Sequence, residues 1–196
     1  MPSPPSVPAE LLAGLAAVLA RLHAPWYVFG AQAVVVWGRP RLTADIDVTV
    51  RLGPDEPGRL VGLLEEAGFM LRVGNDGDFV RRTRVLPFVH ARSGLPLDIV
   101  MAGPGLEELF LSRAVQVTIG DLVVPVISPE DLIVTKILAG REKDIEDVRS
   151  VLRERISSLD LALIRATLAL LEDALGQSDL RPLFEHELAK EEDRRR

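Results

Sequence analysis

The 196-residue sequence contains no cysteine, so disulfides, thiolate metal sites and a cysteine nucleophile are excluded. Net positive charge is also missing, because 29 acidic residues outnumber 23 lysines and arginines. This balance argues against broad, non-specific binding to nucleic acid, although it leaves room for a local basic groove. The first apolar run, at residues 10–23, lacks the features of a signal peptide and is interrupted at Arg21. We therefore expect a cytoplasmic protein that does not enter a membrane.

The composition, with 47% apolar and 27% charged residues, is typical of a globular protein with a sizeable core. Patterns typical of strands occur at residues 25–29, 45–51, 83–92, 95–102, 114–119 and 122–127. Helical patterns occur at residues 10–23, 31–37, 55–69, 128–140, 141–155 and 159–175. We predict an α+β fold, with a mixed β-sheet flanked by helices over residues 1–127 and a helical region over 128–196. The charged C-terminal end is expected to be a solvated or frayed helix.

Two aspartates, one residue apart, lie in the apolar stretch "FGAQAVVVWGRPRLTADIDVTV" at residues 29–50. In a strand Asp45 and Asp47 share one face, whereas Ile46 points to the other. Carboxylates in apolar surroundings need a compensating positive group. Two carboxylates on one face suit Mg²⁺, which prefers oxygen ligands. The same spacing at Asp76 and Asp78 falls in "NDGDF", where a polar turn is the better interpretation.

Two further features support a metal and phosphate site near this strand. Gly30 and Ala31 lie between a predicted strand and a predicted helix, and the N-terminus of a helix favours phosphate. Asp98 lies in "LPLDIVM", where alternation turns its carboxylate away from its apolar neighbours. If its strand lies beside the first one, Asp98 can join a two-metal site. The alternative is an acid on an edge strand that faces water.

A third feature lies in the helical region, in "EDLIVTKILAGREKDIEDV". Lys136, Lys143, Asp144 and Asp147 would share one face of a helix if that helix continued through Gly140. A cation and two carboxylates could then act together. The alternative for Lys136 is a surface lysine whose aliphatic stem covers apolar neighbours.

In combination, these motifs resemble the signature of the DNA polymerase β-like nucleotidyltransferase superfamily. The pattern R-x-T-x-D-I-D at residues 41–47 is similar to bacterial minimal nucleotidyltransferases related to AbiEii-type toxins. "SPEDLIVTKILAGREKDIEDV" also resembles the downstream lysine and the K/R-D-x-x-D segment of that group. The resemblance covers residues 27–152. It implies a nucleotidyltransferase-like sheet and transfer of a nucleoside monophosphate from an NTP to a hydroxyl, with Mg²⁺ or Mn²⁺ and release of pyrophosphate.

The resemblance implies that Gly30 and Ala31 cradle the triphosphate and that Arg41 and Thr43 help to bind the nucleotide. Arg39 and Arg41 could contact the triphosphate or an RNA acceptor, since arginine suits bidentate phosphate contacts. Most members of the superfamily have Gly-Ser or Gly-Gly at the cradle. Ala31 supplies no hydroxyl, which leaves backbone N–H donors and raises the chance of a reduced or repurposed activity.

The resemblance also assigns the metal and charge-stabilising residues. Asp45, Asp47 and Asp98 would be the metal ligands, and Asp98 would help to activate the attacking hydroxyl. Lys136 would neutralise phosphate charge, and Asp144 would complete the site from the helical region. Positioning and charge stabilisation carry most of such chemistry, so no nucleophilic side chain is needed.

Three functions remain open at this level. The leading hypothesis is a nucleotidyltransferase of a toxin-antitoxin or phage-defence system that acts on an RNA such as tRNA, or on a protein, and that has a cognate toxin or antitoxin partner. The second is an antitoxin-type nucleotidyltransferase that modifies its partner toxin. The third is a nucleotide-binding or interaction module that keeps the fold without turnover.

Overall fold

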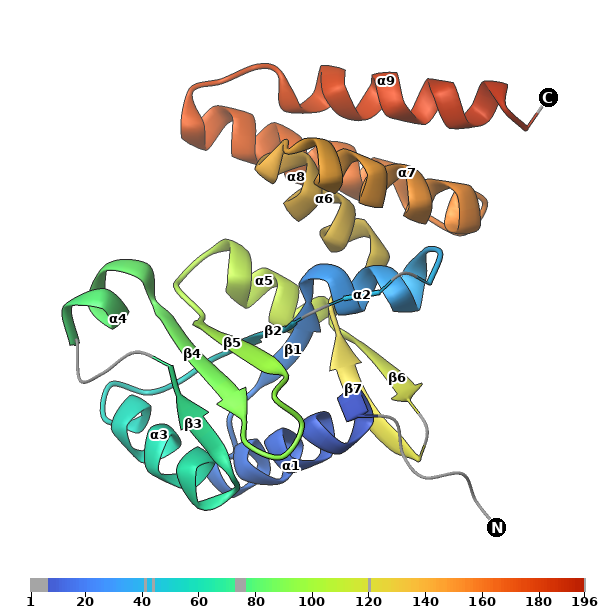
Figure 1. The fold of residues 1–196 in the computed structure, drawn as a ribbon. Coiled ribbons are helices and arrows are strands. Elements are labelled where there is room, and N and C mark those ends of the chain that lie inside the picture. Colours follow the sequence, from blue (N-terminus) through green and yellow to red (C-terminus); the bar gives the residue numbers. More distant parts are fainter. Residues whose placement is uncertain (1–6, 41, 44, 73–76, 120, 196) are drawn as a thin grey trace, which may run out of the picture. The chain divides into compact units, whose positions relative to one another are not determined.

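A computed structural model describes residues 7–40, 42–43, 45–72, 77–119 and 121–195 (Figure 1). The chain divides into two compact units. The sheet unit comprises Met1–Gln32 and Leu42–Ile127, and the helical unit comprises Ala33–Arg41 and Ser128–Arg196. The helical unit thus includes a short segment from between the first two strands. The predicted α+β class is confirmed, because a mixed sheet and flanking helices precede a helical C-terminal region.

The sheet unit contains one mixed sheet, whose strands among the described residues follow the order β3-β4-β5-β2-β1-β7-β6. The strands are β1 Trp26–Phe29, β2 Ile46–Val50, β3 Phe69–Leu71, β4 Val85–His90, β5 Pro96–Met101, β6 Val115–Ile119 and β7 Leu122–Val126. β2 pairs with β5 and β1 pairs with β7 in parallel, and the other neighbours are antiparallel. The two predicted hairpins, β4–β5 and β6–β7, are confirmed.

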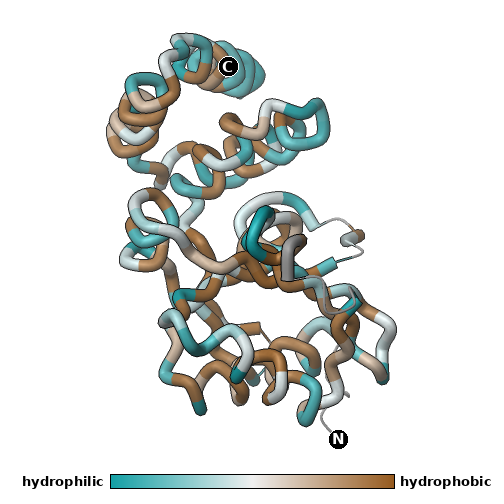
Figure 2. The backbone as a smooth tube through the Cα atoms, turned by 90° about the vertical axis from the view of Figure 1, so that its left-hand side faces the viewer, coloured by the Kyte–Doolittle hydropathy of each residue, from teal (hydrophilic) through white to brown (hydrophobic). Residues whose placement is uncertain are grey.

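Helices flank this sheet, and α1 and α3 each bury an apolar stripe. The helices of the sheet unit are α1 Val7–Leu22, the start of α2 Gly30–Trp37, α3 Glu56–Glu66, α4 Gly77–Thr83 and α5 Leu106–Arg113. α1 and α3 pack together on one face (Figure 1). Leu11, Leu15 and Leu19 recur every four residues along α1 and are buried. Figure 2 shows hydrophobic residues concentrated along the strands that these helices cover.

The helical unit is built from the second half of α2 and four helices of the C-terminal region. These helices are α6 Pro129–Ala139, α7 Glu142–Arg155, α8 Leu161–Leu175 and α9 Leu180–Asp193. Ser128 caps α6, since its Oγ accepts a hydrogen bond of 3.1 Å from the backbone N–H of Asp131. Gly140 ends α6 in the left-handed conformation, with φ of 63°. Within the described residues, no helix combines the length and the hydropathy needed to cross a bilayer.

α9 packs against α7, so the expectation of a solvated or frayed C-terminal helix is wrong. Its apolar face is buried at Leu180, Phe184 and Leu188. Two carboxylates on α9 are also buried, and both meet arginines of α7. Glu187 accepts bonds of 2.5 and 3.1 Å from Arg149, and Glu191 accepts bonds of 2.9 and 3.0 Å from Arg153. The hydrogen bonds from Arg149 lower the pKa of Glu187 to about 2 against the effect of burial.

Candidate functional site

Two aspartates lie directly opposite each other on neighbouring parallel strands of the sheet unit. Asp47 on β2 and Asp98 on β5 are Cα partners. Partners on adjacent strands, about 4.8 Å apart, project to the same face. Their neighbours Ile46 and Ile99 are fully buried, which fits the predicted alternation. β5 lies between β4 and β2, so the interpretation of Asp98 as an edge-strand acid is wrong.

The Asp47 carboxylate lies against the turn from β1 to α2. Phe29, the last residue of β1, is the Cα partner of Asp47. Gly30, the first residue of α2, has φ of 63°, and a Cβ added there would lie only 2.0 Å from Asp47 Oδ2. Glycine is therefore required at this turn by conformation and by space. The first N–H groups of α2 have no partner within the helix, and they begin beside this carboxylate, followed by the half-buried Ala31.

A short hydrogen-bond relay ties α2 to the loop before β2. Gln32 Nε2 donates to Thr43 Oγ1 at 2.9 Å, and Thr43 Oγ1 donates to the backbone carbonyl of Asp45 at 3.0 Å. Thr43 was predicted to bind nucleotide, and its hydroxyl links Gln32 to the first aspartate of the motif. No local sequence pattern indicated a role for Gln32, because its contact joins residues 11 positions apart through a loop. Arg41, the other predicted nucleotide contact, lies outside the described residues.

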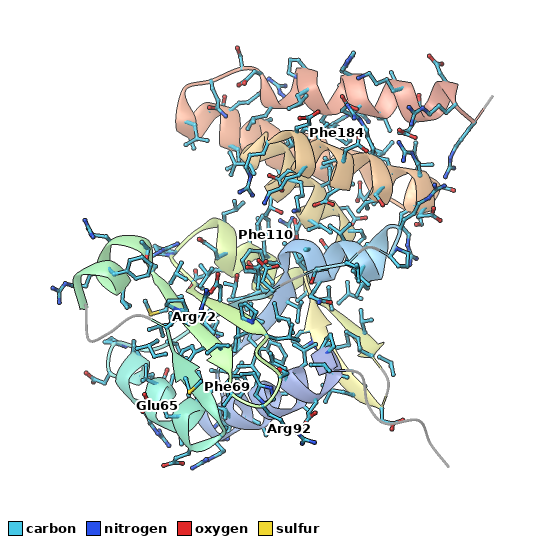
Figure 3. The ribbon with its side chains drawn as sticks, viewed as in Figure 1. Glu65, Phe69, Arg72, Arg92, Phe110 and Phe184 are labelled. Atoms are coloured by element: carbon cyan, nitrogen blue, oxygen red, sulfur yellow. The ribbon has the colours of Figure 1, made fainter. Side chains whose placement is uncertain are left out.

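Arg72 brings a positive charge to Asp98. Like Gln32, Arg72 was not predicted from the sequence. Its backbone N–H donates to Pro87 O at 2.8 Å, and Pro87 is the Cα partner of Asp98. From this position the Arg72 side chain reaches across β4, and Nη2 donates to Asp98 Oδ1 (Figure 3). The side chains of Arg72 and Asp98 are 41% and 33% exposed. The ion pair is therefore open to solvent and to ligands.

The acids of the sheet unit fit a divalent metal ion that arrives with a nucleotide. In the part of the chain that the structure describes, no group of three or more histidine, cysteine, aspartate or glutamate side chains is arranged to hold a metal. Mg²⁺, however, is commonly bound by one or two carboxylates together with phosphate oxygens and water. Asp47 and Asp98 supply two carboxylates in register, beside the small-residue turn at Gly30. The three-carboxylate site that includes Asp45 stays a prediction.

In the helical unit, Lys136 is held between two carboxylates. Its Nζ donates to Asp144 Oδ1 and Asp147 Oδ2, both at 2.8 Å, and Arg141 Nε donates to Asp144 Oδ2 at 2.5 Å. The Lys136 side chain is 12% exposed and Asp144 is fully buried. Burial alone would raise the pKa of Asp144, but hydrogen bonds from Arg141 and Lys136 outweigh burial and lower it.

This cluster forms by a different route from the predicted one. α6 ends at Gly140, so the residues do not share the face of one continuous helix. The turn at Gly140 instead packs α7 against α6, which brings Asp144 and Asp147 to Lys136. Lys143 is exposed and is not among these contacts. The interpretation of Lys136 as a surface lysine is wrong, whereas its predicted role with phosphate stays a prediction.

Comparison with known proteins identifies the family of this chain. Residues 11–179 match the family described as "Nucleotidyltransferase of unknown function (DUF6036)". The chain belongs to this nucleotidyltransferase family. No curated protein matches this nucleotidyltransferase. The narrower likeness to AbiEii-type proteins stays a hypothesis.

Solved structures share the nucleotidyltransferase fold at low sequence identity. A crystal structure of ANT(2″)-Ia in complex with adenylyl-2″-tobramycin has a TM-score of 0.59 and 17% identity, over 87% of this chain and 99% of that one. An antigenic nucleotidyltransferase-like protein from Paracoccidioides brasiliensis gives 0.54 and 17%, over 93% and 95%. The lincomycin-bound lincosamide antibiotic adenylyltransferase LnuA gives 0.51 and 15%, over 76% and 98%. At these identities the likeness shows the fold alone.

Proposed function

We propose that this nucleotidyltransferase transfers a nucleoside monophosphate from an NTP to a hydroxyl of an RNA or protein acceptor, with Mg²⁺ or Mn²⁺. One observation carries the proposal. Asp47 and Asp98 lie in register on parallel strands, and the Asp47 carboxylate fills the space beside Gly30 at the start of α2. Carboxylates and free helix N–H groups at one place suit a metal and a triphosphate together.

The side chains of the sheet unit take the following roles in this proposal. Asp45, Asp47 and Asp98 would hold the divalent ion, which when bound neutralises triphosphate charge and favours the attacking alkoxide. Backbone N–H groups at Gly30 and Ala31 donate to phosphate oxygens. Asp98 accepts the proton of the acceptor hydroxyl while the oxygen of that hydroxyl forms a bond to the α-phosphorus of the NTP. The bond from that phosphorus to pyrophosphate breaks in the same displacement.

Arg72 links substrate binding to the availability of the Asp98 carboxylate. While the Arg72 guanidinium donates to Asp98 Oδ1, that oxygen is occupied by the ion pair. A triphosphate is a strong competitor for an arginine, because it offers several anionic oxygens to the planar guanidinium. Arg72 therefore releases Asp98 when it turns to the nucleotide.

Two residues of the helical unit are included in the proposal on the basis of the resemblance. Lys136 has three N–H donors, and it gives two of them to Asp144 and Asp147. The third is assigned to a phosphate oxygen. Asp144 orients the ammonium through its hydrogen bond, and hydrogen bonds from Arg141 and Lys136 lower the pKa of Asp144 itself.

The test uses the purified full chain with each labelled NTP, Mn²⁺ or Mg²⁺, and separate acceptor pools. The pools are tRNA, cell lysate protein, and a set of aminoglycoside and lincosamide antibiotics. The antibiotics are included because two structural neighbours are described as antibiotic-modifying enzymes. We expect one pool to be labelled by the wild type and not by Asp47→Asn. The control is Asp55→Asn, since Asp55 precedes α3 and makes no side-chain capping bond. Equal labelling by Asp47→Asn and the wild type contradicts the proposal.

The identity of the labelled acceptor separates the biological alternatives. Label on tRNA supports a toxin-antitoxin or phage-defence enzyme that acts on RNA, whereas label on a protein encoded beside it supports an antitoxin-type enzyme that modifies its toxin. The second candidate function is a nucleotide-binding module without turnover. It is favoured by Ala31, which lacks a hydroxyl, and by the Arg72–Asp98 ion pair. Calorimetric binding of NTP and Mg²⁺ without pyrophosphate release would support it.

A further inference from the structure

The helical unit contains a pocket whose walls are mainly arginine. It has a volume of about 490 Å³ and is lined by Arg39, Arg153, Glu191, Arg194 and Arg195. Four guanidinium groups face one carboxylate, in a chain whose formal net charge is −6. Positive charge is therefore concentrated at one place against the overall balance of the protein.

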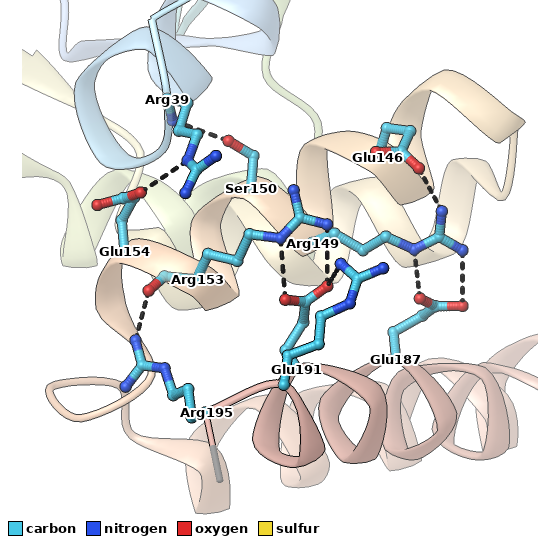
Figure 4. A network of polar contacts seen from close by, with 10 residues as sticks. Arg39, Glu146, Arg149, Ser150, Arg153, Glu154, Glu187, Glu191 and Arg195 are labelled. Carbon is cyan, nitrogen blue, oxygen red and sulfur yellow. Dashed lines mark hydrogen bonds and ion pairs between the residues drawn. The ribbon is translucent and has the colours of Figure 1, made fainter.

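The α2 side of this arginine pocket is fixed to α7 by its backbone. Arg39 follows the end of α2, and its N–H donates to Ser150 Oγ at 2.8 Å (Figure 4). Gly38 lies so close to α7 that an added Cβ would be 2.6 Å from Ser150 Oγ. The Arg39 guanidinium remains 67% exposed, and its Nε donates to the exposed Glu154 at 3.0 Å. Exposed ion pairs of this kind are weak, so Arg39 can exchange Glu154 for another anion.

On the α9 side of the pocket, the carboxylate of Glu191 already accepts hydrogen bonds from two arginines. Glu191 is 2% exposed and accepts two bonds from Arg153 and one bond of 2.8 Å from Arg194 Nη1. Arg195 donates to the backbone carbonyl of Arg153 (Figure 4). One buried carboxylate thus serves two arginines, and the Arg194 side chain remains 61% exposed. With Glu154, which pairs with Arg39 from outside the lining, two carboxylates meet four arginines, so the pocket keeps an excess of positive charge.

A second pocket in the same unit provides a comparison. It has a similar volume of about 520 Å³ and is also lined by two arginines, Arg165 and Arg181. Each of these has its own carboxylate, because Arg165 bonds to Glu185 and Arg181 bonds to Glu172. This pocket is balanced in charge. The excess of arginine is therefore not a general feature of the surface of this unit.

We propose that the arginine pocket binds the phosphate groups of a polyanion, supplied by an RNA backbone or by a free polyphosphate. Guanidinium groups bind phosphate through paired, charge-assisted hydrogen bonds. Trp37 lies two residues before Arg39 in the sequence. The Arg155 guanidinium stacks on the Trp37 ring, with Cζ 5.4 Å from the ring centroid. Aromatic rings and guanidinium planes of this kind stack on unpaired bases, which an RNA supplies and pyrophosphate does not.

Apart from Arg39, which the sequence suggests as a contact for triphosphate or an RNA acceptor, the pocket shares no residue with the proposed nucleotide and metal site. Its binding can be measured without metal, nucleotide or turnover. The probes are inorganic pyrophosphate and a labelled single-stranded RNA of about 12 nucleotides. The full chain is compared with Arg39→Glu, Arg194→Glu and the double variant. The control is Arg165→Glu, which changes an exposed, paired arginine of the balanced pocket. Urea unfolding of each variant checks that the helical unit stays folded.

We expect Arg39→Glu and Arg194→Glu each to weaken RNA binding by about tenfold and to lower the salt dependence by about one counterion. Arg165→Glu should bind as the wild type does. If RNA binds more tightly than pyrophosphate, the phosphate groups in the pocket are those of an RNA backbone. If pyrophosphate binds more tightly than RNA, the natural ligand is a free polyphosphate. Absence of binding, or equal weakening by Arg165→Glu, overturns the proposal. Neither result bears on transfer at Asp47, so the two proposals fail separately.

Discussion

Replacing Gly30 by alanine tests the contact between the β1–α2 turn and the Asp47 carboxylate. Gly30 has φ of 63°, which costs an alanine about 1–2 kcal/mol. The added Cβ would also lie 2.0 Å from Asp47 Oδ2, so either the carboxylate or the turn must move. We expect Gly30→Ala to displace the carboxylate and to lower nucleotidyl transfer by about 100-fold, as small misplacements of reacting groups do.

Gly94→Ala is the matched control for the backbone effect. Gly94 lies in the β4–β5 turn of the same unit, with φ of 69° and no atom within 4 Å of an added Cβ. It carries the same conformational cost of about 1–2 kcal/mol without a collision. The difference between the two variants therefore isolates the contact of Gly30 with Asp47.

The assay combines urea unfolding with calorimetric binding of Mn²⁺ and ATP and with transfer to whichever acceptor is labelled. Both variants should lose unfolding free energy, and Gly30→Ala should lose more. Only Gly30→Ala should lose metal-dependent ATP binding and transfer. If the two variants lose equal stability and both keep ATP binding, the Asp47 carboxylate does not depend on the space at Gly30, and the geometric basis of the proposed site is refuted.

Three further predictions concern the relay and the buried charges. Thr43→Val removes the hydroxyl between α2 and the loop before β2, so unfolding free energy should fall by about 1 kcal/mol and kcat should fall, while Thr43→Ser should restore both. Lys136→Met removes the ammonium that the buried Asp144 and Asp147 share, while Arg141 still bonds to Asp144, so it should cost about 3 kcal/mol in urea unfolding at neutral pH; a cost below about 1 kcal/mol would contradict the buried cluster. The lowered pKa of Glu187 means that its ionised form stabilises the fold above about pH 4.5 and that this stability is lost as the pH falls toward about 2. Glu187→Gln should therefore cost about 2 kcal/mol at neutral pH and little near pH 2, and a cost independent of pH would be inconsistent with this pairing.

The part of the site that sequence predicts best is the part that depends on local alternation. Asp47 and Asp98 each lie between buried apolar neighbours on their own strand, and a period of two places each carboxylate on the opposite face. Their pairing across β2 and β5 depends on sheet order, which no local pattern specifies. Arg72 and Gln32 were missed for the same reason, since their partners lie 26 and 11 residues away.

The elements that sequence analysis missed or misjudged have identifiable causes. β3 has only three residues, which is too short to display alternation. α4 and α5, with seven and eight residues, are barely two turns long, so their helical period is weak. α9 was misjudged because its many charges are typical of a solvated helix. Two of its carboxylates are buried only because arginines 38 residues earlier in the chain lie opposite them.

The two arginine–glutamate pairs between α7 and α9 determine the register in which these two helices pack. Arg149 meets Glu187 and Arg153 meets Glu191, with the same sequence separation of 38. A slip of α9 by one turn would remove one arginine and one buried glutamate from their pairs between the helices, at a cost of several kcal/mol. The packing of these helices is therefore discrete, with one favoured register instead of a range of sliding positions. In related sequences, the members of each pair should change together, because a single exchange of charge leaves a buried carboxylate or guanidinium unmatched.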